Sequence, residues 1–405
     1  MTKIFKTIII FLLFISLIGC DSQNKLNIHI ISDIHYAPRS QYDYVGDFKE
    51  SSETNGSGKQ MKYQEEILDA YINEEIENHP DYIFITGDLV FSGSKENHEL
   101  LSKKLKPLLD NGIKVLVVPG NHDFDNIPFS IKNNVMVYGD PANNKDFKEI
   151  YANYGYKDAI FLDGDSLSYF YKLDNNTCLI ALDTITQYGL TFGSLKDSTL
   201  DWIKERLEYA KANKLDVIMI GHHNLFYHNE MFEIGYTLDN SDDLRKLMKE
   251  YNVHLYISGH MHIQDIIETS TISEILNESF SIFPHHYGEL VIKNHEYQYK
   301  AKEVNVEKYG DQSIDDIKNY STFGYNYLYN NFHTQRKNGL KTNEESKELD
   351  ELLDIATIIN IEYFGGVKDE NDYSEILDNE YAPTYIKGLL KYLKKDNLEL
   401  SGTLR

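Results

Sequence analysis

Five short polar segments, each directly after an apolar stretch rich in β-branched residues, most constrain how this chain can fold. They are Asp33-Ile34-His35, Gly87-Asp88, Gly120-Asn121-His122-Asp123, Gly221-His222-His223 and Gly259-His260-Met261-His262. An apolar, β-branched run of four to eight residues bounded by turn residues is typical of a buried strand. We therefore expect each polar segment to lie at the carboxyl end of a strand.

The apolar periodicity between these segments predicts strands that alternate with helices. The predicted strands cover residues 26–32, 82–86, 114–118, 168–173, 177–182, 215–220, 254–258, 281–283, 288–292 and 297–304. The predicted helices cover residues 64–78, 100–109, 199–212 and 245–251. Residues 168–173 and 177–182 form a predicted hairpin, so the sheets should be mixed. This order predicts an α/β fold in which two stacked sheets are flanked by helices.

The sequence pattern changes at about residue 306. This change divides the chain into a predicted catalytic domain, residues 26–305, and a small helical C-terminal domain, residues 306–405. Helical patterns in the second part cover residues 320–332, 344–359 and 383–394, without a cluster of polar donors. Within the first part, a long polar segment at residues 36–62 follows the first motif. A segment of this length is usually functional or disordered, and its position favours a role facing the substrate.

The N-terminus predicts export. Lys3 and Lys6 precede an apolar run that is short for a membrane span, which needs about 20 residues. Its end resembles a bacterial lipobox, which makes residues 1–19 a predicted signal peptide, Cys20 a lipidated anchor and residues 20–25 a tether. The alternative is an uncleaved N-terminal anchor. We expect an exported lipoprotein on the outer face of the cell membrane, with Cys178, the only other cysteine, buried in a strand.

The net charge of the chain restricts the classes of partner that it is expected to bind. The formal net charge is −24, from 40 basic and 64 acidic residues. Such a protein should be repelled by nucleic acid and by anionic membrane surfaces, so we expect no nucleic-acid-binding surface. A small anionic substrate stays compatible with this charge if bound cations dominate the local field.

The polar segments together offer oxygen and nitrogen donors that suit divalent metal ions. Most of these segments alone are more often a loop or a turn, Gly120-Asn121-His122-Asp123 alone is a turn as often as a site, and only the ordered set of five indicates a metal site. Two metal ions can activate a water and clamp the oxygens of a phosphate ester during hydrolysis. Asp88 is the natural bridging carboxylate, because it follows the strand at residues 82–86 and Gly87 gives the backbone room to turn.

This ordered set is similar to that of the calcineurin-like metallophosphoesterases, over residues 26–305. The resemblance implies a four-layer fold and two metal ions, which could be manganese, iron, zinc or cobalt. It implies a bridging hydroxide that attacks phosphorus. The first ion would be held by Asp33, His35, Asp88 and His262, and the second by Asp88, Asn121, His222 and His260.

The resemblance also implies roles for neighbouring residues. His122 would not be a ligand but would face the phosphate and protonate the leaving oxygen. Asp123 would orient a histidine from behind. His223 would either support the ligands or face the substrate. His285 and His286 could line the cleft or lie in a surface turn.

In its details the chain resembles the lipid-anchored bacterial class III cyclic-nucleotide phosphodiesterase-like branch. The matching features are Gly58-Lys59-Gln60 and the segment Phe283-Pro284-His285-His286-Tyr287-Gly288, whereas Asn224 stands where many relatives have proline. We expect a phosphodiester substrate, and 3′,5′-cyclic nucleotides are the leading candidates. The alternatives are an extracytoplasmic phosphomonoesterase or nucleotidase, and a non-catalytic lipoprotein that captures a ligand.

Overall fold

Two mixed β-sheets pack face to face in the computed structural model, which describes residues 25–232, 234–338, 347–379 and 381–405. The first sheet has the order β15 (Glu399–Thr403), β14 (Glu296–Glu303), β13 (His286–Lys293), β1 (Lys25–Ile31), β2 (Tyr82–Thr86) and β3 (Lys114–Val118). The second has the order β11 (Asp265–Glu268), β12 (Ser273–Leu276), β10 (Leu255–Ser258), β9 (Asp216–Ile220), β8 (Thr177–Ala181), β7 (Tyr169–Lys172) and β6 (Phe161–Leu162).

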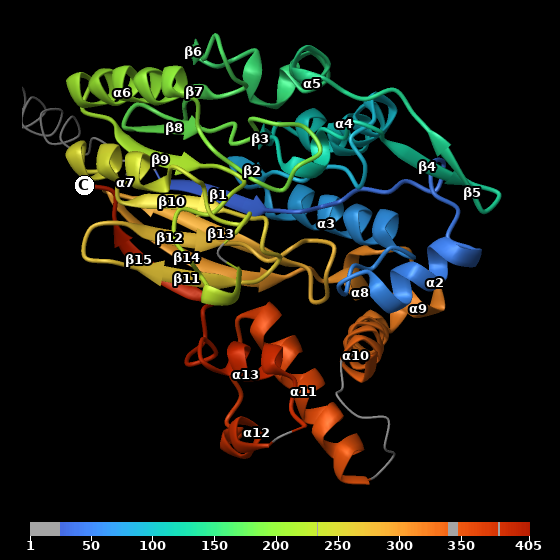
Figure 1. The fold of residues 1–405 in the computed structure, drawn as a ribbon. Helices are drawn as coiled ribbons and strands as arrows, with labels where there is room; N and C mark the ends of the chain where they lie inside the picture. Colours follow the sequence, from blue (N-terminus) through green and yellow to red (C-terminus); the bar gives the residue numbers. More distant parts are fainter. Residues whose placement is uncertain (1–24, 233, 339–346, 380) are drawn as a thin grey trace, which may run out of the picture.

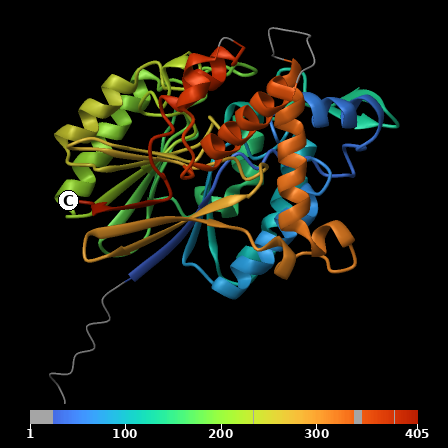
Figure 2. The ribbon, with the colours of Figure 1, turned by 90° about the horizontal axis from the view of Figure 1, so that it is seen from below.

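Alternating side chains in these strands build the layers. Ile220 of β9 belongs to the central core together with residues of the first sheet, whereas its neighbour Met219 packs on the opposite face. That outer face is covered by α6 (Asp197–Ala212) and α7 (Ser241–Glu250), and the first sheet is covered by α3 (Gln64–Asn78) and α4 (Lys95–Asp110). The predicted four-layer α/β arrangement is therefore confirmed (Figures 1 and 2).

Strand direction sets where the loops lie. Strands β1, β2 and β3 run parallel to one another, and so do β8, β9 and β10. The loops that follow parallel strands lie at one edge of their sheet. Cys178 is buried in β8, where the sequence analysis placed it.

The remaining elements before residue 306 are inserted in the sequence between the strands and helices of this framework. They are α2 (Gly46–Asn55), the 3₁₀-helix η1 (Asn121–Asp123), the hairpin β4 (Phe129–Lys132) and β5 (Val135–Tyr138), α5 (Asn144–Ile150), the π-helix η2 (Ala152–Tyr156) and the 3₁₀-helix η3 (Glu230–Phe232). Residues 36–62 are thus not a structureless loop, because they contain α2, and Tyr42 and Met61 are buried there against Ile131 of β4. Residues 281–283 form no strand; Ile282 makes only an isolated bridge to Lys59.

The C-terminal part is helical and packs directly on the sheets. It contains α8 (Val306–Tyr309), α9 (Asp315–Lys318), α10 (Tyr320–Asn338), α11 (Lys347–Gly365), α12 (Ser374–Asp378) and α13 (Thr384–Leu390). Leu352 and Ile386 share a hydrophobic cluster with Met261 and Ile263, which follow β10. The chain then returns to the first sheet as β15, antiparallel to β14, a strand that the sequence pattern did not reveal (Figure 1).

The predicted signal peptide and Cys20 lie outside the described residues. Within the described part of the chain, no helix combines the length and the apolar character needed to cross a bilayer.

Candidate metal centre

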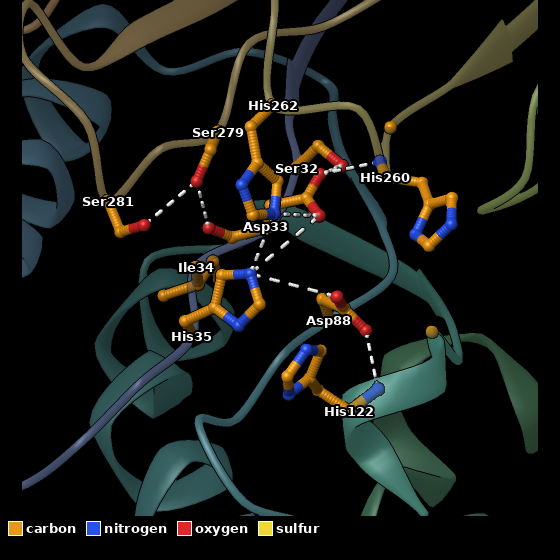
Figure 3. A network of polar contacts seen from close by, with 12 residues as sticks. Ser32, Asp33, Ile34, His35, Asp88, His122, His260, His262, Ser279 and Ser281 are labelled. Carbon is orange, nitrogen blue, oxygen red and sulfur yellow. Dashed lines mark hydrogen bonds and ion pairs between the residues drawn. The ribbon is translucent and has the colours of Figure 1, made fainter. Parts of the chain in front are cut away.

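The structure brings residues from all five polar segments to one place. Asp33 and His35 follow β1, Asp88 follows β2, and His122 lies in η1, just after β3 (Figure 3). The segments after β9 and β10 reach the same place from the second sheet, as their contacts with these residues show. The expectation that distant strand ends converge is therefore met.

One group of donors contains Asp33, His35, Asp88 and His262. One ligand atom from each lies within 4.8 Å of the others. His35 Nε2 lies 3.0 Å from His262 Nε2 and 3.7 Å from Asp88 Oδ2, and His262 Nε2 lies 3.3 Å from Asp33 Oδ1. Two carboxylates and two imidazoles thus face a common point.

A second group contains Asp88, His222 and His260, with the same spacing of ligand atoms. His222 Nε2 lies 3.4 Å from Asp88 Oδ1 and 3.1 Å from Asn121 Oδ1. Asp88 is the one residue common to both groups, and it presents a different oxygen to each.

Backbone carbonyls fix which ring nitrogen His222 and His260 offer. His222 Nδ1 donates to the carbonyl of Thr86 over 2.9 Å, which leaves Nε2 to face Asp88 and Asn121. His260 Nε2 donates to the carbonyl of Gly235 over 2.8 Å, which leaves Nδ1 free. Such partners orient metal-ligating histidines and set their tautomers.

The charges of the site are arranged for cations. Burial acts to raise the pKa of Asp88, but the positive charge of His222 and then that of His122 hold this pKa well below the usual range. Burial lowers the pKa of His260 to about 3, so its ring is neutral. Burial also opposes a charge on His222, yet Asp88 raises its pKa to about 9. A metal ion would take the place of this proton, because ligating imidazoles are neutral.

The backbone is held in an unusual conformation at five of these positions. The φ angles are +52° at Asp33, +46° at His35, +48° at Asp88, +76° at His260 and +62° at His262. Non-glycine residues rarely adopt positive φ, and such residues cluster at functional sites, where the surroundings hold them.

Gly87 and Gly120 make this close packing possible. A β-carbon at Gly87 would overlap the ring of His222, and one at Gly120 would overlap Asp88. Gly87 also has φ +95°, which confirms that it turns the chain after β2.

The donor set fits a pair of metal ions. Asp33 Oδ1 is buried and accepts no well-formed hydrogen bond from the residues that the structure describes, and its neighbours, His262 Nε2 at 3.3 Å and His35 Nε2 at 3.9 Å, are themselves candidate ligands. A buried carboxylate oxygen without a donor is costly unless a cation compensates it. Carboxylate, amide and imidazole ligands without thiolate suit manganese, iron, zinc or cobalt. These residues could therefore bind two metal ions.

His122 lies beside the two groups without belonging to either. Its backbone N–H donates to Asp88 Oδ1 over 2.8 Å, and its ring centroid lies 4.8 Å from that of His35. Its Nδ1 lies 3.3 Å from the carbonyl of Phe91, and the side chain is half-buried. Among the residues that the structure describes, none hydrogen-bonds His122 Nε2, which lies next to the site.

His223 does not fit a substrate-facing role. The side chain is buried, its Nδ1 lies 2.8 Å from the Thr184 hydroxyl, and its Nε2 donates to the carbonyl of Thr191 over 3.0 Å. Both ring nitrogens are therefore occupied. The ring packs 4.4 Å from that of His260, so His223 supports a proposed ligand instead.

The Asp123 carboxylate does not orient a histidine, although the backbone carbonyl of Asp123 accepts a hydrogen bond from His98 Nε2 over 2.9 Å. Its carboxylate accepts hydrogen bonds from the backbone N–H groups of Leu89, Val90 and Gly120, over 2.9, 3.1 and 2.8 Å. Burial, and then the charge of Asp88, raises the pKa of Asp123 to about 8. The expected partner, a histidine, is thus wrong for the carboxylate. The Asp123 carboxylate instead hydrogen-bonds backbone N–H groups in both loops that carry Asp88 and Asn121.

His285 and His286 neither line this site nor lie in a surface turn. His285 is buried between the carbonyl of Phe280 and the hydroxyl of Tyr320. His286 is buried against Glu278, with 2.6 Å between Nδ1 and Oε2. Both are structural residues of the region that leads into β13.

Lys59 is the residue whose place in the site the sequence reasoning did not find. It comes from the segment at residues 36–62, and its ammonium interacts electrostatically with Asp33 and Asp88. Burial lowers the pKa of Lys59, and the two carboxylates oppose this shift. The sequence analysis used Gly58-Lys59-Gln60 only as a matching feature and expected residues 36–62 to face the substrate, without giving Lys59 a role of its own.

Comparisons with known proteins agree with this geometry. The family model described as calcineurin-like phosphoesterase matches residues 26–264. A probable cyclic nucleotide phosphodiesterase of Coxiella burnetii is 28% identical over 183 residues, which cover 45% of this chain and 60% of that protein. A probable glycerophosphodiester phosphodiesterase of Arcobacter nitrofigilis is 24% identical over 184 residues, which cover 45% of this chain and 57% of that protein.

The match therefore spans about 60% of the length of these curated relatives. Among solved structures, a dimetal phosphatase from Danio rerio is similar in fold, with a TM-score of 0.51 and 12% identity, and the alignment covers 69% of this chain and 96% of that one. The matched region holds every donor of the two groups, and the chain belongs to the calcineurin-like phosphoesterase family.

Proposed function

We propose that this protein is a two-metal phosphodiesterase. One ion would be held by Asp33, His35, Asp88 and His262, and the other by Asp88, Asn121, His222 and His260. The observation that carries this proposal is the position of Asp88. Its Oδ2 lies 3.7 Å from His35 Nε2 in one donor group and its Oδ1 lies 3.4 Å from His222 Nε2 in the other.

When bound, two such ions supply a nucleophile at neutral pH and neutralise charge on the phosphoryl oxygens. The side chains of this protein would supply the rest. His122, with Nδ1–H held by the carbonyl of Phe91, would present Nε2–H to the leaving oxygen. Lys59 would add a positive charge beside the carboxylates.

We infer that the substrate is a small phosphodiester, and 3′,5′-cyclic nucleotides are the leading candidates. Both curated relatives are named as phosphodiesterases, one for cyclic nucleotides and one for glycerophosphodiesters. The net charge of −24 disfavours a nucleic acid as the substrate.

The test compares two chromogenic substrates on protein reloaded with manganese, zinc or iron. We expect faster hydrolysis of bis-(p-nitrophenyl) phosphate than of p-nitrophenyl phosphate. A clear preference for the monoester would replace the proposal by the phosphomonoesterase alternative. Turnover that survives both chelation and Asn121→Ala would exclude the metal mechanism. Stoichiometric metal without hydrolysis of either ester would favour the ligand-capturing lipoprotein.

We also propose export and anchoring at the outer face of the cell membrane through a lipid on Cys20. The support is the sequence pattern of residues 1–20, which lie outside the described part of the chain. In a bacterial host, labelled palmitate should enter the wild-type protein but not Cys20→Ala. Equal labelling of both would refute the anchor.

A further inference from the structure

A cavity of about 280 Å³ connects the candidate metal centre with the C-terminal helices. His260 and His262 line it together with residues of α10, α11 and α13. Pockets for whole ligands have volumes of about 300–1,000 Å³, so this cavity suits one part of a substrate. The C-terminal helices lie outside the region that matches the family, so family membership does not determine what this cavity binds.

Aromatic rings form a continuous row along this cavity. The Tyr236 ring lies 5.2 Å from that of His260, the Phe232 ring lies 5.6 Å from Tyr236, and the Tyr385 ring lies 6.0 Å from Phe232. The guanidinium of Arg336 lies 4.4 Å from the centroid of Tyr385 and ends the row. A group attached to a phosphate at the metal centre would therefore meet flat apolar surfaces and then a cation.

Two polar groups that line this cavity have no hydrogen-bond partner among the residues that the structure describes. Arg336 Nε is buried without a hydrogen bond, and Arg336 has no carboxylate partner among the residues that the structure describes. Asn360 is 1% exposed, and its Oδ1 is likewise unpaired. Buried polar groups left unpaired are costly, so they are expected to meet a ligand or water.

These features restrict the chemistry of the occupant. Arg336 requires an acceptor, the Asn360 carbonyl requires a donor, and the rings favour a planar π-system. A choline or ethanolamine group is disfavoured, because Arg336 already covers the ring of Tyr385 and would repel a second cation. A glycerol group has no face to stack on the rings. A nucleobase has the planar face, the acceptors and, in most cases, an exocyclic amine.

We propose that this cavity is a base-binding subsite in which Arg336 and Asn360 hydrogen-bond the edge of a nucleobase while its phosphate lies at the metal centre. The proposal rests on the proposed phosphodiesterase function. It places the residues that select the base on helices α10 and α11, which are separate in the sequence from the five polar segments.

The test uses calorimetry on the metal-loaded full chain with probes that differ only in the base. The four ribonucleoside 5′-monophosphates are compared with ribose 5-phosphate. At least one nucleotide should bind about 10–100-fold more tightly than ribose 5-phosphate, which corresponds to the usual strength of hydrogen bonds to a charged group. Arg336→Met should remove most of this preference without weakening ribose 5-phosphate.

Lys337→Met is the matched control, because Lys337 is the exposed neighbour on the same helix, and it should leave the preference unchanged. Asn360→Ala provides a second variant and should reduce the preference by itself. Equal affinity of all five probes in the wild type, or a preference that both variants retain, would overturn the subsite. Turnover of bis-(p-nitrophenyl) phosphate tests the proposed function separately, since the calorimetric comparison needs no hydrolysis.

Discussion

The role of Asp123 offers a sharp test of how this site is held together. Its carboxylate bonds the N–H groups of Leu89 and Val90, directly after Asp88, and that of Gly120, directly before Asn121. Asp123→Ala would remove these acceptors and leave three buried donors unpaired. The loops after β2 and β3 would then lose the hydrogen bonds from Leu89 and Val90 that join them and keep the one from the His122 N–H to Asp88 Oδ1.

The expected cost follows from these three contacts. Each unpaired buried donor costs about 1–3 kcal/mol, which gives about 3–9 kcal/mol in total. We expect the lower half of this range, about 3–6 kcal/mol, because a water molecule can enter the space that the carboxyl group leaves. With an unfolding entropy of about 2.1 cal/mol/K per residue, this loss lowers the melting temperature of a chain of this length by about 4–7 °C.

Displaced loops should also lower the rate. A shift of about 1 Å in a catalytic group can cost on the order of 10²-fold in rate. The assays are differential scanning calorimetry, metal content per chain and hydrolysis of bis-(p-nitrophenyl) phosphate. Asp123→Asn keeps one acceptor oxygen and should lose about half as much stability. Asp201→Ala, at an exposed position of α6, should change the free energy of unfolding by less than about 0.5 kcal/mol.

Asp123→Ala with the stability, metal content and rate of the wild type would refute this reasoning. A large loss of stability with an unchanged rate would limit Asp123 to folding.

Three further predictions follow from the site and its surroundings. His122→Ala should keep both metal ions, measured by emission spectrometry, and lose about 10²–10⁴-fold in rate; an equal loss of metal would make His122 a ligand. Asp88→Asn should lose both ions and activity, because one uncharged oxygen cannot replace a shared carboxylate, and retention of two ions would contradict the bridge. Asp265 and Glu274 flank buried His228 at 2.8 and 3.2 Å. Burial opposes its charge, yet Glu274 and then Asp265 raise the pKa of His228 to about 9. The charged form of His228 stabilises the folded chain fully below pH 6.5, the ordinary pKa of histidine, and this stabilisation is lost as the pH rises through 9. The free energy of unfolding should therefore fall by about 3 kcal/mol over this interval. Chemical denaturation should show this fall in the wild type and a flatter profile in His228→Gln.

Much of the site could be predicted because its chemistry is local in the sequence. Each donor lies within a few residues of the end of an apolar strand, and strand direction brings those ends to one edge. The family resemblance that the ordered segments carry therefore implied the grouping around Asp88 without knowledge of any contact between the sheets. The alternation of strands and helices predicted the four layers for the same reason, since burial of one face determines the period of apolar residues.

Contacts between distant segments were decided only by the tertiary structure. Whether His223 faces a substrate depends on Thr184 and Thr191, which lie more than 30 residues away. The entry of Lys59 into the site depends on how its segment packs, and β15 depends on pairing with a strand about 100 residues earlier. Periodicity reports which face of an element is buried, but it does not report which partner covers that face or where a polar side chain then points. For that reason the C-terminal helices read as a separate helical region in the sequence, whereas in the folded chain Arg336 and Asn360 line a cavity beside the candidate metal centre.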